Sequence, residues 1–391
     1  MPIKVTPIEG APLGAKIELP EGCTDPSKLS AEDFEDLYKA VLTHLVVVIP
    51  GMADLSPESQ WKLTTLFDKT CDQTGKSYGH GKEFRHAQSV LRKDGTSIPN
   101  QPQVQVLGQG KFPAGHYGMG ELNLTHPTHF TFHKDPLPEE KSFNVADSEI
   151  PLTRFYRWHL DSALYKLSPP VATTLLGIHV PPHGRMQKIV YEPEYGYDEP
   201  DSLELTQGAT CFVSSANAFD QLSEEEQKIA LGTTIVYAPH PYIFISPAGA
   251  TSDGLTMVSE GKEMPLDELP EWEEAHVKKF PVVWTNPVTK KQHLQIHGCC
   301  VHKLILPDGT ELQLEDARKK LHSWMRPAIA SKNVYAHSWD AGDLCIFFNR
   351  GVWHSVTGQF DEGERRLMHQ CNIASGEDPV LVLPEETEVV A

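Results

Sequence analysis

Residues 154–161 read Arg154-Phe155-Tyr156-Arg157-Trp158-His159-Leu160-Asp161. Aromatic residues favour a β-strand, here over 155–160, and the side chains of residues i and i+2 of a strand point to the same face. His159 and Asp161 therefore project into the same space, as two ligands of one metal ion must. Two histidines and one carboxylate on one face of a metal leave the opposite positions open, which suits non-haem Fe(II) and its oxygen chemistry.

The H-x-D triplet alone is weak evidence, because a chain with 19 histidines is expected to contain about one by chance. A second triplet does occur, at 133–135, but its aspartate precedes Pro136 in a proline-rich stretch that is typical of a turn. Residues 154–161 are flanked by β-forming residues, so we predict that His159 and Asp161 are the ligands. The alternative for His159 is a strand histidine that is satisfied by hydrogen bonds within the protein.

A later stretch, residues 340–355, supplies the remaining ligand. It contains a turn, the apolar strand-like run 344–348, a second turn and then His354. Arg365 and Arg366 follow eleven and twelve residues later. An arginine on the strand after the distal histidine can reach the inner end of the metal site and bind a carboxylate with two parallel hydrogen bonds, as lysine cannot. The alternative is a surface arginine pair that follows an acidic segment.

Beyond residue 100 the sequence consists of short β-like runs separated by proline and glycine. Many strands at this spacing, without alternation with helices, favour a sandwich or jelly roll over a parallel α/β sheet. Helices are expected after Ser30, Ser56 and Ser223, which can each cap a first turn, and over 314–325. We expect a single domain over 1–391, with an N-terminal helical cover over about 30–75 and a lid or surface excursion over about 250–280.

The composition limits the compartment and the partners. The chain has 391 residues, of which 39% are hydrophobic and 22% charged, so it is neither disordered nor membrane-like, and no stretch approaches the about 18 apolar residues of a spanning helix. A net charge of −19 makes nucleic acid and anionic membranes poor partners. A small-molecule substrate remains possible, because one or two placed arginines can hold a small anion. Seven scattered cysteines without a C-x-x-C pair, and no signal-peptide pattern, predict a cytoplasmic protein. A homo-oligomer is left open.

These motifs together resemble the taurine/2-oxoglutarate dioxygenases. The shared features are the H-x-D pair, a distant histidine after a Trp…Gly-Asp…Asn-Arg pattern over 339–350, and an arginine about a dozen residues later. Residues 280–289, Phe-Pro-Val-Val-Trp-Thr-Asn-Pro-Val-Thr, are similar to a further stretch of that family. The resemblance spans roughly 30–375. Within it, the segments 154–161 and 365–372 are most similar to the fungal xanthine dioxygenases.

The resemblance implies a mainly β fold with flanking helices, namely the double-stranded β-helix, or jelly roll, of these dioxygenases. It also implies that His159, Asp161 and His354 hold catalytic Fe(II), and that 2-oxoglutarate and O2 are co-substrates. Arg366 would bind the distal carboxylate of 2-oxoglutarate, with Arg365 as the alternative if the register shifts by one residue.

The resemblance also implies a threonine that binds the same carboxylate after the first ligand pair. The corresponding stretch here, residues 184–188, contains no threonine. Gln187 or Lys188 is therefore expected to take its place.

The substrate contacts follow from the same resemblance. The taurine enzymes hold the sulfonate with a second arginine four residues after the first, where this chain has Gln370. An amide donates and accepts, and so suits a flat neutral heterocycle with N–H and C=O edges; Asn372 on the same face adds a second amide. Resemblance to the xanthine enzymes adds Gln103, Lys134 and Asp147.

The implied reaction is the hydroxylation of xanthine to urate, with release of succinate and CO2. One alternative is a related 2-oxoglutarate-dependent hydroxylase of a sulfonate, a sulfate ester or another small acid. The other is a non-catalytic β-barrel binding protein with an inactive site.

Overall fold

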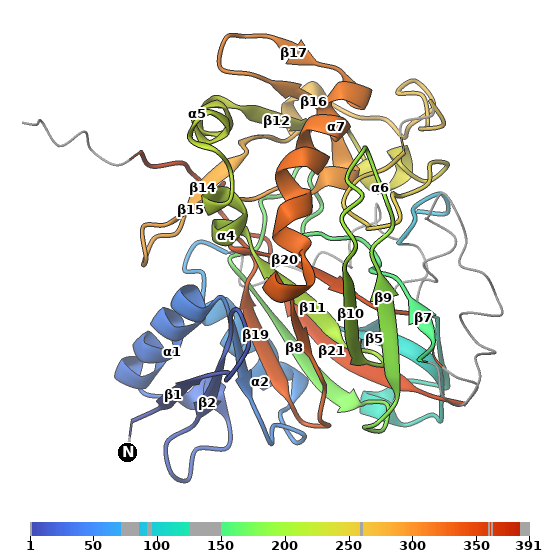
Figure 1. The fold of residues 1–391 in the computed structure, drawn as a ribbon. Helices are drawn as coiled ribbons and strands as arrows, with labels where there is room; N and C mark the ends of the chain where they lie inside the picture. Colours follow the sequence, from blue (N-terminus) through green and yellow to red (C-terminus); the bar gives the residue numbers. More distant parts are fainter. Residues whose placement is uncertain are drawn as a thin grey trace, which may run out of the picture.

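The computed structural model describes residues 2–71, 86–91, 96–125, 150–258, 261–358, 360 and 363–383. The described chain is mainly β, as the strand-like runs predict, with helices packed around the sheets (Figure 1). Its largest sheet has nine strands, and the pairing is antiparallel except between β2 and β3. In sheet order these strands are β1 (Lys4–Pro7), β2 (Ala15–Glu18), β3 (Val46–Ile49), β19 (Leu344–Phe348), β8 (Ala172–His179), β21 (Arg366–Asn372), β5 (Gln101–Phe112) and β4 (Thr96–Ile98), with β6 (Leu122–Leu124) paired to the end of β5.

A smaller antiparallel sheet packs against the middle of the large one. Its strands, in order, are β18 (Tyr335–His337), β11 (Thr210–Ser214) and β20 (Val352–Val356). Phe212 of β11 contacts Phe347 of β19, with ring centroids 5.3 Å apart, and both share one buried apolar cluster with Met368 of β21. The two sheets therefore enclose a common core. A third, short sheet consists of β10 (Ser202–Thr206), β9 (Met186–Val190) and β7 (Leu152–Thr153).

Between β11 and β18 the chain builds a second layer of structure over residues 215–334, at the top of Figure 1. Its buried cluster includes Phe155 and Trp158, so this block packs on the segment that carries two predicted ligands. Its strands are β12 (Thr234–Tyr237), β13 (Lys279–Pro281), β14 (Val283–Thr285), β15 (Gln292–Leu294), β16 (Val301–Ile305) and β17 (Glu311–Leu312). Its α-helices are α4 (Ser215–Asp220), α5 (Glu224–Gly232), α6 (Pro241–Phe244) and α7 (Leu314–Met325).

The helices begin where the capping signals predict. The hydroxyl of Ser30 accepts the amide of Asp33 at 3.1 Å at the start of α1 (Ala31–His44). Ser56 caps α2 (Pro57–Leu66) in the same way, and Ser223 caps α5. The apolar face of α1 packs into the core beside β3. In the described ranges, none of the helices has the length and apolarity that a membrane span requires.

Short 3-10 helices complete the connections. They are η1 (Pro26–Lys28), η3 (His116–Gly118), η5 (Glu274–His276), η6 (Gly298–Cys300), η7 (Arg326–Ile329) and η8 (Ser331–Asn333).

Residues 250–257 are buried, which corrects the expected surface excursion over 250–280 in its first part. This stretch is rich in small residues and lies against the backbone of the metal-ligand segment. Gly254 has φ +74°, and a Cβ atom there would lie 2.2 Å from the carbonyl oxygen of Tyr156. Asp253 holds the stretch to α7 through a 2.7 Å contact with Nε2 of His322. Small side chains and the buried contact between Asp253 and His322 thus place this part of the chain inside the protein.

Candidate metal centre

Segment 154–161 runs antiparallel to β20, but it is not a regular strand, so the predicted continuous strand over 155–160 is wrong in this respect. It is bridged to His354 of β20 by His159, and to Thr357, directly after β20, by Phe155. From one bridge to the other the segment advances by four residues and its partner by three, so the segment accommodates one extra residue, as a β-bulge does. The amide of Trp158 donates instead to the carbonyl of Gly254, at 2.9 Å, because the block 215–334 packs here.

His159 and His354 face each other across this pairing. The amide of His159 donates to the carbonyl of His354 at 3.0 Å, and the amide of His354 donates back at 2.9 Å. Residues directly opposite each other on neighbouring strands share a face. The two imidazole centroids are 4.1 Å apart, so the pairing joins two histidines that lie far apart in the chain.

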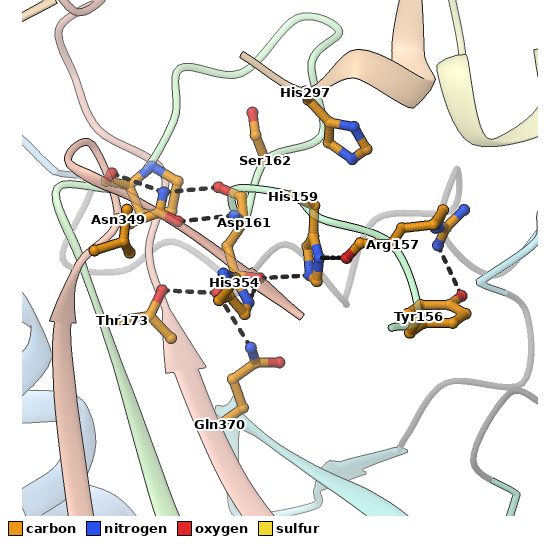
Figure 2. Close-up of polar contacts among 12 residues, drawn as sticks. Tyr156, Arg157, His159, Asp161, Ser162, Thr173, His297, Asn349, His354 and Gln370 are labelled. Carbon is orange, nitrogen blue, oxygen red and sulfur yellow. Dashed lines mark hydrogen bonds and ion pairs between the residues drawn. The ribbon is translucent and has the colours of Figure 1, made fainter. Parts of the chain in front are cut away.

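Asp161 completes a group of three possible ligands (Figure 2). Its Oδ1 lies 3.6 Å from Nε2 of His354 and 3.9 Å from Nε2 of His159. All three ligand atoms lie within 4.8 Å of one another, and this is the one such group in the described part of the chain. The geometry places the predicted triad together.

The imidazoles are held in the form that binds a metal. Nδ1 of His159 contacts the carbonyl of Arg157 at 2.8 Å, so Nδ1 carries the proton and Nε2 faces Asp161. Burial and the neighbouring His354 hold the pKa of His159 well below its usual range. Burial also lowers the pKa of His354, although Asp161 acts in the opposite direction. Both rings are neutral near pH 7, and two neutral imidazoles with one carboxylate fit a divalent ion such as Fe(II).

Asn349, in the turn between β19 and β20, holds the backbone of Asp161. Its Oδ1 accepts the amide of Asp161 at 2.7 Å, and its Nδ2 donates to the carbonyls of Asp161 and Pro170 at 2.9 and 3.1 Å. Asn349 is fully buried. The sequence analysis used it only as part of the Asn-Arg pattern, and its clamping of the ligand loop became visible in the structure.

Arg366 is the inward-facing member of the arginine pair. It is 1% exposed, and its NH2 donates to Oγ1 of Thr210 at 3.2 Å. Its Nε and NH1 are buried without a hydrogen-bond partner among the described residues. Burial lowers its pKa to about 10, so it remains a cation at neutral pH. A buried cation without an anion is costly, and the site therefore fits an anionic ligand.

Arg365 points the other way. Its NH1 contacts the carbonyl of Lys111 at 3.4 Å, and its guanidinium lies 5.2 Å from the ring centroid of Phe112. Arg365 directly precedes β21 and Arg366 is its first residue, so these two positions of an extended chain have opposite surroundings, as alternation requires.

Thr210 is a candidate carboxylate ligand that the sequence analysis missed. Its Oγ1 accepts from Arg366 and from Nε1 of Trp339, at 3.2 and 3.1 Å. Residues 184–188 lie at the start of the β9–β10 hairpin, and the rest of this hairpin precedes β11, so Thr210 lies later in the chain than the expected position. The signal that could have found it is local: Thr210 opens the apolar run of β11 directly after the turn at Gly208.

Gln187 and Lys188 contact other groups. Nε2 of Gln187 donates to the carbonyl of Gly358 at 3.2 Å, and Nζ of Lys188 lies 3.5 Å from Oε1 of Glu204. Their role at the co-substrate stays a prediction, whereas the contact between Thr210 and Arg366 is direct.

The described substrate candidates gather on the paired strands β21 and β5. Gln370 donates from Nε2 to Oδ2 of Asp161 at 3.2 Å, and Asn372 is buried on the same face. Gln370 pairs directly with Gln105, a buried residue that the sequence analysis missed. Gln103 lies two residues from Gln105 and accepts from Gln101 at 2.7 Å. Lys134 and Asp147 lie outside the described residues.

His297 also lies beside the triad and was missed, because nothing near it in the sequence resembles a ligand motif. Its ring centroid is 6.0 Å from that of His159. Burial, with Arg157 and His354, holds the pKa of His297 well below its usual range. His297 thus forms, with the two ligand histidines, a group of three neutral imidazoles.

Comparison with known proteins identifies the family. A family model described as taurine catabolism dioxygenase TauD, TfdA family matches residues 4–372. The chain belongs to the TauD, TfdA family. The chain is 44% identical over 372 residues to the α-ketoglutarate-dependent xanthine dioxygenase xanA of Emericella nidulans. The alignment covers 94% of this chain and 96% of that protein.

Two further proteins are similar to this chain. The chain is 42% identical over 373 residues to the α-ketoglutarate-dependent xanthine dioxygenase xan1 of Schizosaccharomyces pombe, covering 94% of this chain and 86% of that protein. A crystal structure of a taurine dioxygenase from Burkholderia xenovorans matches with a TM-score of 0.56 at 16% identity, covering 97% of this chain and 93% of that one. This structural likeness supports the mainly β dioxygenase architecture.

Proposed function

We propose that this protein is an Fe(II)- and 2-oxoglutarate-dependent dioxygenase that converts xanthine, 2-oxoglutarate and O2 into urate, succinate and CO2. Its similarity to two fungal xanthine dioxygenases, at 42–44% identity over 94% of the chain, supports this substrate. A sulfonate substrate is less well supported, because this chain has the amide Gln370 where the taurine enzymes have a second arginine.

The observation that carries the proposal is the buried Arg366 beside the triad. Phe212 of β11 pairs with His354, and its ring centroid lies 6.1 Å from the imidazole. Thr210, which contacts Arg366, lies two residues along the same face of β11, a step of about 7 Å. A five-carbon diacid can span that step, with one end at the triad and its distal carboxylate at the guanidinium.

The chain's own residues then have distinct roles. His159, Asp161 and His354 would hold Fe(II), which with 2-oxoglutarate supplies the oxidative hydroxylation of a C–H bond. Arg366 and Thr210 would bind the distal carboxylate, the first with charge and the second with its hydroxyl.

The purine contacts belong to the same proposal. Gln370, Asn372 and Gln103 lie on two paired strands and present amides, which match the alternating N–H and C=O groups of xanthine. Lys134 and Asp147 complete the predicted set.

At the scale of the fold we propose a double-stranded β-helix in a single domain. Two sheets with a common core, and the likeness to a taurine dioxygenase structure, support it. We also place the protein in the cytoplasm; the buried thiols of the adjacent Cys299 and Cys300 suit a reducing compartment.

The test is an assay of purified protein loaded with Fe(II) under anaerobic conditions and then exposed to air. With xanthine and 2-oxoglutarate we expect urate and succinate in equal amounts, and with taurine in place of xanthine no substrate-dependent succinate. Urate formation without 2-oxoglutarate, or none in its presence, would overturn the proposed function.

A further inference from the structure

We propose that Thr173 and Gln370 are positioning residues that hold Oδ2 of Asp161, so that the carboxylate presents Oδ1 alone to the metal. This inference rests on the proposed metal centre, but not on the identity of the organic substrate. It gives both residues a role in metal binding.

The two carboxylate oxygens of Asp161 have different neighbours. Oδ1 of Asp161 is the oxygen that faces the imidazoles of His159 and His354, at 3.9 and 3.6 Å. Oδ2 accepts the hydroxyl of Thr173 at 2.8 Å and the amide of Gln370 at 3.2 Å (Figure 2). An ionised carboxylate only accepts hydrogen bonds, so two donors on Oδ2 fix the rotation of the group about its Cβ–Cγ bond.

The two donors come from paired strands of the large sheet. Thr173 lies on β8 and Gln370 on β21, and the strands are joined by the ladder that pairs Asn372 with Thr173. Thr173 is fully buried, so its hydroxyl has little freedom to leave the carboxylate for water. Asn349 separately clamps the backbone of Asp161. The main chain and the carboxylate of one ligand are thus held from three different strands or turns.

This arrangement has a chemical consequence for the centre. A carboxylate free to rotate can offer both oxygens to one metal ion and occupy two coordination positions. Holding Oδ2 at Thr173 and Gln370 leaves Asp161 with one ligand oxygen, and so keeps a further position free for the small-molecule reactants.

The same contacts orient the amide of Gln370. Its nitrogen faces the acceptor-only carboxylate, and its Oε1 points to the other side, as Figure 2 shows. The oxygen is thereby presented as an acceptor for an N–H group. The metal ligand and the predicted purine-binding amide are linked through one side chain.

The test uses Thr173→Val, which removes the hydroxyl at nearly constant volume. The matched control is Thr174→Val, the same change at the next buried residue, whose hydroxyl contacts Gln60 and Thr64 on the other face of β8. Mn(II) affinity is measured by isothermal titration on the metal-stripped full chain, without 2-oxoglutarate. We expect Thr173→Val to weaken Mn(II) binding about 10-fold, the size typical of lost partners behind a metal ligand, and Thr174→Val to leave it unchanged.

A conservative variant separates positioning from packing. Thr173→Ser keeps the hydroxyl, and its Mn(II) affinity should return to within about threefold of wild type. A Thr173→Val protein that binds as tightly as wild type, or a Thr173→Ser protein as weak as Thr173→Val, overturns the inference.

Gln370 provides an independent arm in case Thr173→Val does not fold. Gln370→Ala should weaken Mn(II) binding severalfold, whereas Gln227→Ala, the same change at a half-buried glutamine of α5, should not. Equal Mn(II) affinities for these two variants overturn the role of Gln370. If wild type itself binds no Mn(II), the proposed function fails together with this inference. Wild-type binding with no effect of the Thr173 and Gln370 variants rejects this inference alone.

Discussion

Arg365 and Arg366 are adjacent in the chain, yet their side chains have opposite surroundings. Arg366 is buried with two nitrogens that have no hydrogen-bond partner among the described residues, whereas Arg365 lies over the ring of Phe112. The difference follows from strand alternation, which sends successive side chains to opposite faces. Arg366, and not Arg365, is therefore the candidate for binding a carboxylate.

This contrast yields a prediction for co-substrate binding. Arg366→Lys keeps a positive charge but loses the planar pair of donors, so the KM for 2-oxoglutarate should rise about 10- to 100-fold, as expected for the loss of one charge-assisted hydrogen bond. Arg365→Lys is the control and should change this KM less than about twofold, because its contacts lie at the surface. Succinate release at varied 2-oxoglutarate concentrations measures both, and equal KM values would contradict the assignment.

At the scale of elements, the ligand segment 154–161 depends on two neighbours that are remote in sequence. The turn between β19 and β20 holds it through Asn349, and the buried stretch 250–257 packs on it through Gly254. These contacts explain how an irregular, bulged segment can still present His159 and Asp161 in a defined geometry.

Asn349→Ala should destabilise the metal-free protein. The change leaves two backbone groups of Asp161 and the carbonyl of Pro170 without their side-chain partner, at a cost of about 2–4 kcal/mol in the free energy of unfolding. Asn333→Ala is the control, because that half-buried side chain donates one hydrogen bond, to Pro327, and should cost about 1 kcal/mol. Urea denaturation measures both, and equal losses would disprove the clamping role.

Gly254→Ala tests the close approach at the bulge. Gly254 and Gly196 both have positive φ, +74° and +82°, so alanine strains the backbone at either position. A Cβ at Gly254 would also meet the Tyr156 carbonyl, whereas no atom lies within 4 Å of one at Gly196. Gly196→Ala should therefore cost about 1–2 kcal/mol, and Gly254→Ala clearly more, with weaker Mn(II) binding as well. Similar melting temperatures for the two variants would show that the Tyr156 carbonyl does not exclude a side chain at position 254.

At the scale of the whole molecule, the triad joins parts of the chain that precede and follow the block 215–334. His159 and Asp161 lie before this block and His354 after it, on β20. An ion bound there would bind the folded chain only, since the three side chains are brought together by the tertiary structure.

Metal binding should therefore raise the melting temperature. At a free Mn(II) concentration of 100 times Kd, the gain is about 2.7 kcal/mol, which corresponds to an increase of several degrees. EDTA should reverse the increase and His354→Ala should abolish it, whereas His302→Ala, on β16 of the second block, should retain it. Thermal denaturation with and without Mn(II) provides the measurement, and a persistent increase in His354→Ala would place the ion elsewhere.

Features that depend on neighbouring residues could be predicted from the amino-acid sequence. Serine caps located three helices, and α7 begins and ends where its pattern predicts. The H-x-D pair, the distant histidine and the arginine pair could be recognised because each is a short pattern of residue types. The structure brings the three predicted ligands within 4.8 Å of one another.

The contacts between remote strands, in contrast, became known from the folded structure. It turned Arg366 inward, placed Thr210 against it, and put Thr173 and Gln370 on one oxygen of Asp161. It also replaced the expected strand before His159 by a bulged segment. The reason is physical: such contacts depend on strand register and on hairpins inserted between the strands, which residue types within a short window do not encode.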